Sequence, residues 1–340
     1  MKKALTTFIQ YVVFLGLGIW IIYHMLHQLT DAQTNELIAA IKSINVWYLI
    51  PIFFVGFLSH FFRAIRWKYL LETVDLKPSV VNMTFAVLIG YIANLALPRA
   101  GEVAKCTVLA KYENMPAHKM IGTIVAERAF DLFSLVIITC LAFALQAHTI
   151  NEYLSEGITK ISGDIARHRN ILIAGIIVLV IAIVLLVRLY RKHSETKVGR
   201  FVNEMLRGIM SIFHMKRRWA FMGYTVLIWA MYLLQLYIGF RSLPATAHLT
   251  PLAALVVLVY GSVGMIVTPG GIGLYPFLVA QILGAYMIAE VPGQAFGWIA
   301  WVVQTGVIVV LGVISLLVIH PYNRKRNGQA AVGTTENIQP

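Results

Sequence analysis

The sequence has few charged residues and few cysteines. Asp, Glu, Lys and Arg make up 13% of the 340 residues, against about 25% in an ordinary soluble domain. So few charged residues cannot cover a water-facing surface, which excludes a typical soluble enzyme and a disordered protein. Two cysteines, Cys106 and Cys140, are too few for a disulfide framework or a cysteine-rich metal site.

The sequence also lacks the common signatures of cofactor and metal chemistry. It contains no Gly-x-x-x-x-Gly-Lys phosphate loop and no His-Glu-x-x-His metal motif, and its ten histidines are scattered. His60 lies in an apolar stretch and is better interpreted as an interior residue than as a ligand. We therefore expect no cofactor, no metal and no catalytic constellation, and we predict that the chain is not an enzyme.

Apolar residues are abundant. They make up 59% of the chain, and the mean hydropathy is +0.76. A helix needs roughly 20 apolar residues to cross a bilayer. Six runs qualify as full spans: Phe8–Leu26, Trp47–Phe62, Met120–Leu145, Ile171–Val187, Trp219–Phe240 and Phe296–Ile319. The predicted fold class is therefore an all-α, polytopic transmembrane helix bundle.

Two further apolar stretches are interrupted by proline and glycine, which end helices. Val80–Leu97 runs into Pro98 and Gly101, in a broken segment near 80–119. Leu252–Val267 runs into Pro269, and the break lies near 251–289. The glycines that follow this proline are Gly270, Gly271 and Gly273. We interpret both stretches as re-entrant, although the second could instead be two tilted crossings.

Basic residues predict the orientation, because cytoplasmic segments carry the excess of Lys and Arg. If each broken segment returns to the side it entered from, both termini lie inside. The segments 1–7, 63–79, 99–119, 188–218 and 320–340 are then cytoplasmic and hold 22 of the 28 basic residues. The net charge of +13 is then explained by topology, and no nucleic-acid partner is needed. Residues 1–326 form one predicted membrane domain, and 327–340 a disordered cytoplasmic tail.

The two broken segments would enter from opposite faces, one in each half of the chain. Such an inverted arrangement is typical of transporters, whose binding site lies near the midplane where the broken ends meet. Charged residues at membrane depth are candidates for that site. Glu127 and Asp131 lie one helical turn apart, with Arg128 beside them. They could line a polar path for an ion or a headgroup, or form a neutralised structural cluster.

The first broken segment adds Asn94, Arg99, Glu102 and Lys105. A helix that starts after Pro98 would offer free amide donors to a phosphate, and the alternative is a cytoplasmic loop with surface charges. Arg63 and Arg66 close the second span. They could contact a phosphate, but an interfacial anchor is the stronger interpretation.

Four motifs in this order resemble a known family. They are Arg63-x-x-Arg66-Trp67, Asn94-x-x-x-Pro98-Arg99-x-Gly101-Glu102-x-x-Lys105, Glu127-Arg128-x-x-Asp131 and Pro269-Gly270-Gly271-x-Gly273. The chain resembles the transmembrane-region family of lysylphosphatidylglycerol synthases, also described as flippase-like membrane proteins. The likeness covers roughly residues 5–320.

The resemblance implies a lipid translocase of the bacterial inner membrane, standing alone because the chain ends about twenty residues after its last span. Its partners would be a membrane lipid (an anionic or aminoacylated phospholipid, or a polyprenyl phosphate) and a separate lipid-modifying enzyme. One departure is that Leu274, Tyr275 and Pro276 follow the glycine motif, where family members often carry a glutamate. Two alternatives stay open: a membrane enzyme using Glu127 or Asp131 as acid or base, and a non-transporting accessory subunit. The oligomeric state is not predicted.

Overall fold

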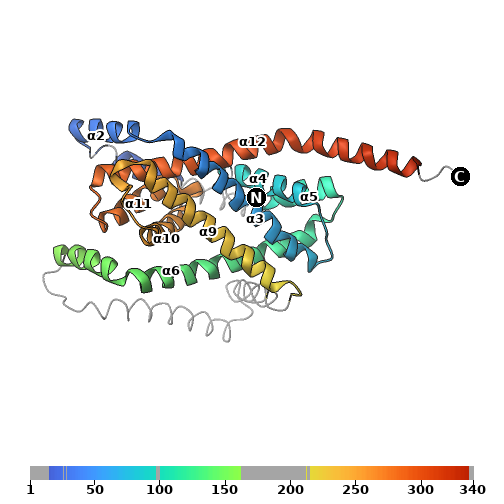
Figure 1. Cartoon of the computed structure of the whole chain (residues 1–340), viewed down its shortest axis with the longest axis horizontal. Coiled ribbons are helices and arrows are strands. Elements are labelled where there is room, and N and C mark those ends of the chain that lie inside the picture. The colour runs from blue at the N-terminus through green and yellow to red at the C-terminus, as the bar shows by residue number, and fades with distance from the viewer. Residues whose placement is uncertain are drawn as a thin grey trace.

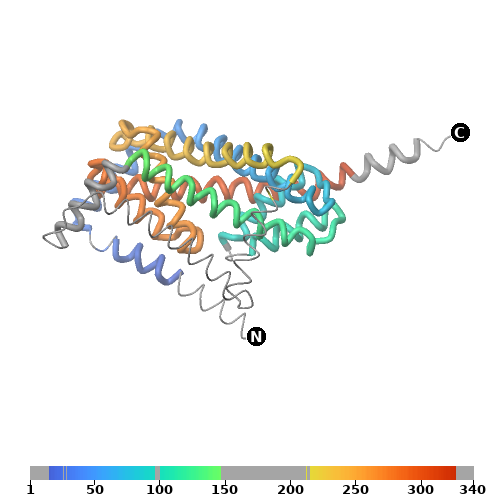
Figure 2. Tube along the Cα trace, turned by 90° about the horizontal axis from the view of Figure 1, so that it is seen from below, coloured from blue at the N-terminus to red at the C-terminus, as the bar shows by residue number. Residues whose placement is uncertain are grey.

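A computed structural model shows a helical bundle (Figures 1 and 2). It describes residues 15–25, 27, 29–96, 100–161, 212 and 215–336, with backbone alone for 96, 147–161 and 327–336. Every regular element in the described part of the chain is helical. The predicted fold class is confirmed.

Four described helices are long and apolar enough to span a membrane. The spanning parts are Val46–Glu72, Ala117–Gln146, Arg218–Ser242 and Glu290–Arg326. They belong to α3 (Leu49–Glu72, after the short η1, Val46–Tyr48), α6 (Ala117–Ile161), α9 (Arg218–Ser242) and α12 (Glu290–Glu336). These four correspond to the second, third, fifth and sixth predicted spans. The first predicted span is described only as the helical segment Leu15–Met25, and the fourth, Ile171–Val187, lies outside the described residues.

The outer surface of these helices is apolar. Ile137 on α6 is 51% exposed and Leu317 on α12 is 71% exposed. Large exposed hydrophobic residues on long apolar helices form a surface suited to contact with lipid tails. Helix α2 (Asp31–Lys42) packs on α12 instead, and its Leu37 is buried in the core.

Helices α4 (Val80–Ala96) and α5 (Ala100–Glu113) form an antiparallel pair, which we call the first hairpin. Asn82 near the start of α4 donates to Glu113 Oε1 at the end of α5, at 2.5 Å. Asn82 also exchanges two 2.8 Å hydrogen bonds with Asn323 of α12, and Arg326 pairs with Glu113 at 2.7 Å. The start of α4 and the end of α5 form the base of the first hairpin, and Asn323 and Arg326 of α12 hold this base closed.

Helices α10 (Pro251–Val267) and α11 (Leu274–Gly284) form the second hairpin, with η3 (Pro269–Gly271) between them. The turn needs glycine, because Gly270, Gly271 and Gly273 all have φ between 62° and 74°, a region that L side chains rarely adopt. Trp301 of α12 donates its indole N–H to the Gly270 carbonyl at 2.8 Å. A helix therefore holds the turn in place from outside the hairpin.

The tips of the two hairpins meet. A Cβ on Gly270 would lie 3.4 Å from Leu95 Cδ2, near the end of α4, and α4 contacts η3. The backbone of Gly18, in the segment Leu15–Met25, packs directly on Ile272 and Gly273. Along α12 the first hairpin lies toward the C-terminal half and the second toward the N-terminal half (Figure 1). The two broken segments therefore occupy opposite ends of the bundle and converge between them.

The structure differs from one expectation at the C-terminus. Helix α12 continues to Glu336, so the predicted disordered tail is helical over residues 327–336. A helix grows at little cost once its nucleus exists, since each added residue adds one hydrogen bond. The preceding span supplies that nucleus.

Candidate functional site

Three helices bring charged side chains together beside the first hairpin. Arg63 and Arg66 come from α3, Lys105 from α5, and Glu127 and Asp131 from α6. All except Asp131 are less than one-tenth exposed. Residues predicted from three separate motifs thus form one cluster, which we call the charged cluster.

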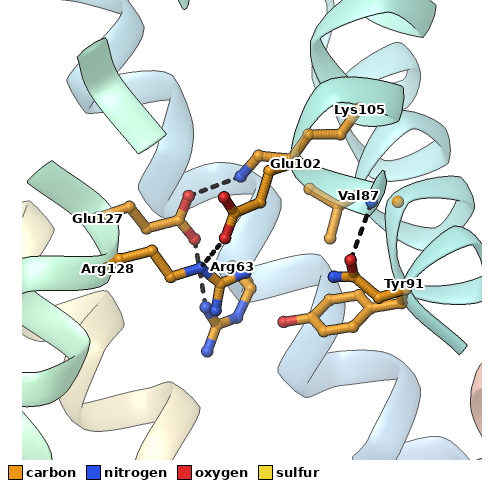
Figure 3. A pocket seen from close by; sticks show the side chains of 10 residues that line it. Arg63, Val87, Tyr91, Glu102, Lys105, Glu127 and Arg128 are labelled. Atoms are coloured by element: carbon orange, nitrogen blue, oxygen red, sulfur yellow. Dashed lines mark hydrogen bonds and ion pairs between the residues drawn. The ribbon is translucent and has the colours of Figure 1, made fainter. Parts of the chain in front are cut away.

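Glu127 is the centre of the charged cluster and is fully buried. Its Oε1 lies 3.2 Å from Arg63 Nη1 and 3.3 Å from Arg66 Nη2. Its Oε2 lies 2.7 Å from Lys105 Nζ. Figure 3 shows Lys105 and Arg63 pointing toward Glu127 from different helices. One carboxylate therefore holds three cations and ties α3 and α5 to α6.

Asp131 repeats the arrangement one turn further along α6. Its Oδ2 lies 2.7 Å from Arg63 Nη1, and its Oδ1 lies 2.7 Å from Arg66 Nη2. The one-turn spacing of Glu127 and Asp131 places both carboxylates against the same two arginines. The interpretation of Arg63 and Arg66 as an interfacial anchor is wrong, because both side chains are buried in ion pairs.

Glu102 and Arg128 form a separate, more accessible pair. Arg128 Nε lies 3.0 Å from Glu102 Oε1, and these side chains are 43% and 34% exposed, respectively. Both border a shallow recess that is open to the outside. The recess is lined by Arg63, Val87, Gly90, Tyr91, Asn94, Gly101, Glu102, Lys105, Glu127 and Arg128. The exposed pair therefore lies where the charged cluster can be reached.

Close packing of the first hairpin positions Lys105. A Cβ on Gly101 would collide with the Gly90 carbonyl, so α4 and α5 approach at backbone distance. Asn94 Oδ1 accepts a hydrogen bond from the Gly101 amide at 2.8 Å. This bond satisfies one of the free amides at the start of α5. The helix start is thus capped by a side chain and not free for a phosphate, contrary to the expectation for this amide.

Aromatic and hydroxyl side chains complete the surroundings. Trp67 belongs to the first motif, whereas Thr123, Tyr91 and Tyr232 belong to none of the four. Lys105 Nζ lies 4.3 Å from the centre of the Trp67 ring, and the Trp67 indole donates to Thr123 Oγ1 at 2.9 Å. Arg63 Nη2 donates to Tyr232 Oη at 3.2 Å. Tyr91, which lines the recess, precedes Asn94 by one turn, so helical spacing could have identified it. Nothing local marks Tyr232, which reaches the cluster from α9.

The remaining predicted site residues are elsewhere. Pro98 and Arg99 lie outside the described residues. Pro269, Gly270, Gly271 and Gly273 form the tip of the second hairpin and do not line the recess. Among the described residues, no group of three or more His, Cys, Asp or Glu is placed to hold a metal ion.

The fold and the site together define a class: a multi-pass helical membrane protein with a buried, ion-paired cluster next to broken helices. The family comparison agrees. The chain belongs to the family described as the lysylphosphatidylglycerol synthase TM region, whose profile matches residues 8–312.

Two curated relatives are archaeal. The chain is similar to a "UPF0104 membrane protein" of Methanocaldococcus jannaschii, 22% identical over 310 residues, covering 87% of this chain and 91% of the relative. It is also similar to a "UPF0104 membrane protein" of Pyrococcus horikoshii, 29% identical over 236 residues, covering 62% of this chain and 69% of the relative. No solved structure gives a significant match.

Proposed function

We propose that this protein is a lipid translocase that binds the headgroup phosphate of a membrane lipid in the recess and moves it across the bilayer. The observation that carries the proposal is the charge balance at the site. Arg63, Arg66, Lys105 and Arg128 are matched by only three carboxylates, Glu102, Glu127 and Asp131. One positive charge remains for an anionic headgroup. Membership in the family of the lysylphosphatidylglycerol synthase TM region supports a lipid as the ligand.

Moving a charged headgroup across a bilayer requires a path lined by charged groups. An isolated charge in hydrocarbon is prohibitively costly, whereas a charge paired inside protein is tolerated. Glu127 lies ten residues after the start of α6, or roughly 15 Å along the helix axis. The site is therefore well inside the spanning helix. Charged side chains at such depth are most often functional.

The two hairpins would supply the structural basis for crossing. In this proposal both are re-entrant and enter from opposite faces, with the chain termini in the cytoplasm. The closed base of the first hairpin, where Asn82 meets Glu113, supports entry and return on one side. The meeting of Leu95 with the Gly270 turn supports a path between the two halves. The headgroup would move along this path while its acyl chains stay in the bilayer.

The pair Glu102–Arg128 would admit the headgroup. It is the exposed ion pair of the site, and an exposed pair contributes only about 0–1 kcal/mol. Its separation would free Arg128 to bind the phosphate while Glu127 and Asp131 keep the inner arginines in place. Arg99 would add a bidentate donor.

The proposal places the protein in the plasma membrane, and in a bacterium as the family resemblance implies. A separate enzyme would modify the lipid, and this chain would carry the product or its precursor. Transport, in this proposal, needs no cofactor and no chemical change of the lipid.

Proteoliposomes containing the purified chain test the proposal. Head-labelled anionic, zwitterionic, lysyl-modified and polyprenyl-phosphate lipids are followed with a membrane-impermeant quencher. We expect faster exposure of at least one lipid, and a loss of that activity in Arg128→Gln. The matched control is Arg217→Gln, whose side chain is 63% exposed and lies 3.9 Å from Glu72. Conversion of the headgroup would instead indicate an enzyme, and neither movement nor conversion an accessory subunit.

A further inference from the structure

The carboxylates of the charged cluster are all ion-paired. Both oxygens of Glu127 and both oxygens of Asp131 lie within 3.3 Å of an arginine or lysine nitrogen. Glu102, at the edge of the recess, is paired with Arg128. In the described site, each carboxylate already neutralises a cation of the protein. An incoming ammonium group would have to displace one of those cations.

The two arginines also have unused donors. The Nε–H groups of Arg63 and Arg66 are buried and have no hydrogen-bond partner, and Asp131 Oδ1, although ion-paired with Arg66, accepts no hydrogen bond either. A buried donor without an acceptor costs free energy. Arg63 also lines the recess. The site thus has unused donors and an excess positive charge, and both favour an acceptor-rich anion.

The second hairpin brings no opposing charge. Residues 251–284, which include α10, η3 and α11, contain no Asp, Glu, Lys, Arg or His. After the glycine turn, Tyr275 packs its ring against Gly261 and is buried. A cationic headgroup that leaves the charged cluster would therefore find no carboxylate on the hairpin that meets it.

We propose that the recess selects a phosphate group that carries no attached ammonium, so that anionic lipids bind in preference to zwitterionic and aminoacylated lipids. This selectivity rests on the proposed function, since it concerns the ligand of the same site. An ammonium group next to the surplus positive charge is repelled, and the low dielectric of the interior strengthens the repulsion. The recess is lined by three cations, Arg63, Lys105 and Arg128, and by two carboxylates, Glu102 and Glu127. A phosphate diester or monoester therefore meets a net positive charge there.

Binding is measured with the full chain in detergent micelles, by calorimetry, so that transport is not involved. The probes are dihexanoyl lipids with phosphatidylglycerol, phosphatidylethanolamine and lysyl-phosphatidylglycerol headgroups. We expect phosphatidylglycerol to bind at least about tenfold more tightly than the other two, as one unbalanced charge is worth about that factor. Equal or tighter binding of the lysyl lipid would overturn the proposal.

An isosteric variant tests the cause of the preference. Asn94→Asp adds a carboxylate to the recess and keeps the acceptor for the Gly101 amide. It should weaken phosphatidylglycerol binding about tenfold and bring the lysyl lipid close to it. Asn45→Asp is the matched control, because Asn45 also caps a helix start, accepting from Trp47 N, and is exposed away from the site. An unchanged preference in Asn94→Asp would contradict the charge argument.

Two further arms separate this inference from the proposed function. Glycerol 1-phosphate and inorganic phosphate test whether acyl chains matter. If either binds as tightly as the lipid, recognition of phosphate by the recess is supported and the proposed function as a lipid translocase is refuted. If anionic lipids bind selectively but do not move in proteoliposomes, the selectivity again holds without transport. If lipids move but the lysyl lipid is preferred, transport holds and the selectivity fails.

Discussion

Replacing Glu127 by Gln should be among the most destabilising single changes in the described part of the chain. The substitution keeps the shape but removes the charge that faces Arg63, Arg66 and Lys105 at 2.7–3.3 Å. Asp131 would be left as the one carboxylate of the charged cluster. Removing one partner of a buried ion pair costs about 3–5 kcal/mol, because the remaining charge stays buried without compensation. We expect a loss of that size in the free energy of unfolding.

The assay is reversible unfolding in mixed micelles of a mild detergent and dodecyl sulfate, followed by tryptophan fluorescence. Glu102→Gln is the matched control, because the same replacement removes a charge from the exposed pair with Arg128. That pair is 34–43% exposed, so its loss should cost about 0–1 kcal/mol. Adding Lys105→Gln to Glu127→Gln should recover part of the loss, because it removes one unpaired buried cation.

The reasoning fails if Glu127→Gln costs no more than Glu102→Gln. It also fails if the double variant is less stable by the full sum of its two single variants. Additive losses would mean that Lys105 and Glu127 do not interact in the folded protein.

Three other predictions concern the hairpins. Gly101→Ala should lose about 1–3 kcal/mol of stability in the same unfolding assay, because its methyl group would overlap the Gly90 carbonyl; a neutral effect would mean that α4 and α5 are further apart. Gly273→Ala should cost at least about 1–2 kcal/mol, since φ is +72° and the methyl group would meet the backbone of Gly18; stability equal to the wild type would rule out this turn. Burial alone would raise the pKa of Glu113, which lies outside the spanning helices, but hydrogen bonds from its neighbours outweigh it and hold the pKa below the usual 4.5. The unfolded state then binds the proton more readily, so stability should fall as the pH drops below about 4.5, and Glu113→Gln should flatten that part of the pH profile.

The spanning helices could be predicted from the sequence because their signal is local. Long apolar runs need a nonpolar solvent, and a helix satisfies every backbone hydrogen bond within its own segment. Both helix breaks were predicted for the same reason, since Pro98 and the glycines after Pro269 act on their own backbone. The helical state of residues 327–336 was missed, because the preceding span extends into a polar sequence that indicates disorder by composition.

The role of the arginines depended on tertiary structure. Arg63 and Arg66 end an apolar run beside Trp67, and such a pattern is typical of an interfacial anchor. Only the packing of α3 against α6 shows that they face Glu127 and Asp131. Tyr232 likewise joins the site from α9, 169 residues from Arg63 in sequence.

The sequence by itself therefore determined which segments are helical and apolar, where two of them break, and which charged residues lie in or next to the apolar helices. These properties follow from hydropathy and backbone chemistry over short stretches. Only the tertiary structure decided which charges pair, which arginine donors stay unpaired, and that the two hairpin tips meet. Ion pairs and backbone contacts such as that of Gly90 with Gly101 act over a few ångströms between helices, and sequence spacing within one helix carries no information about them.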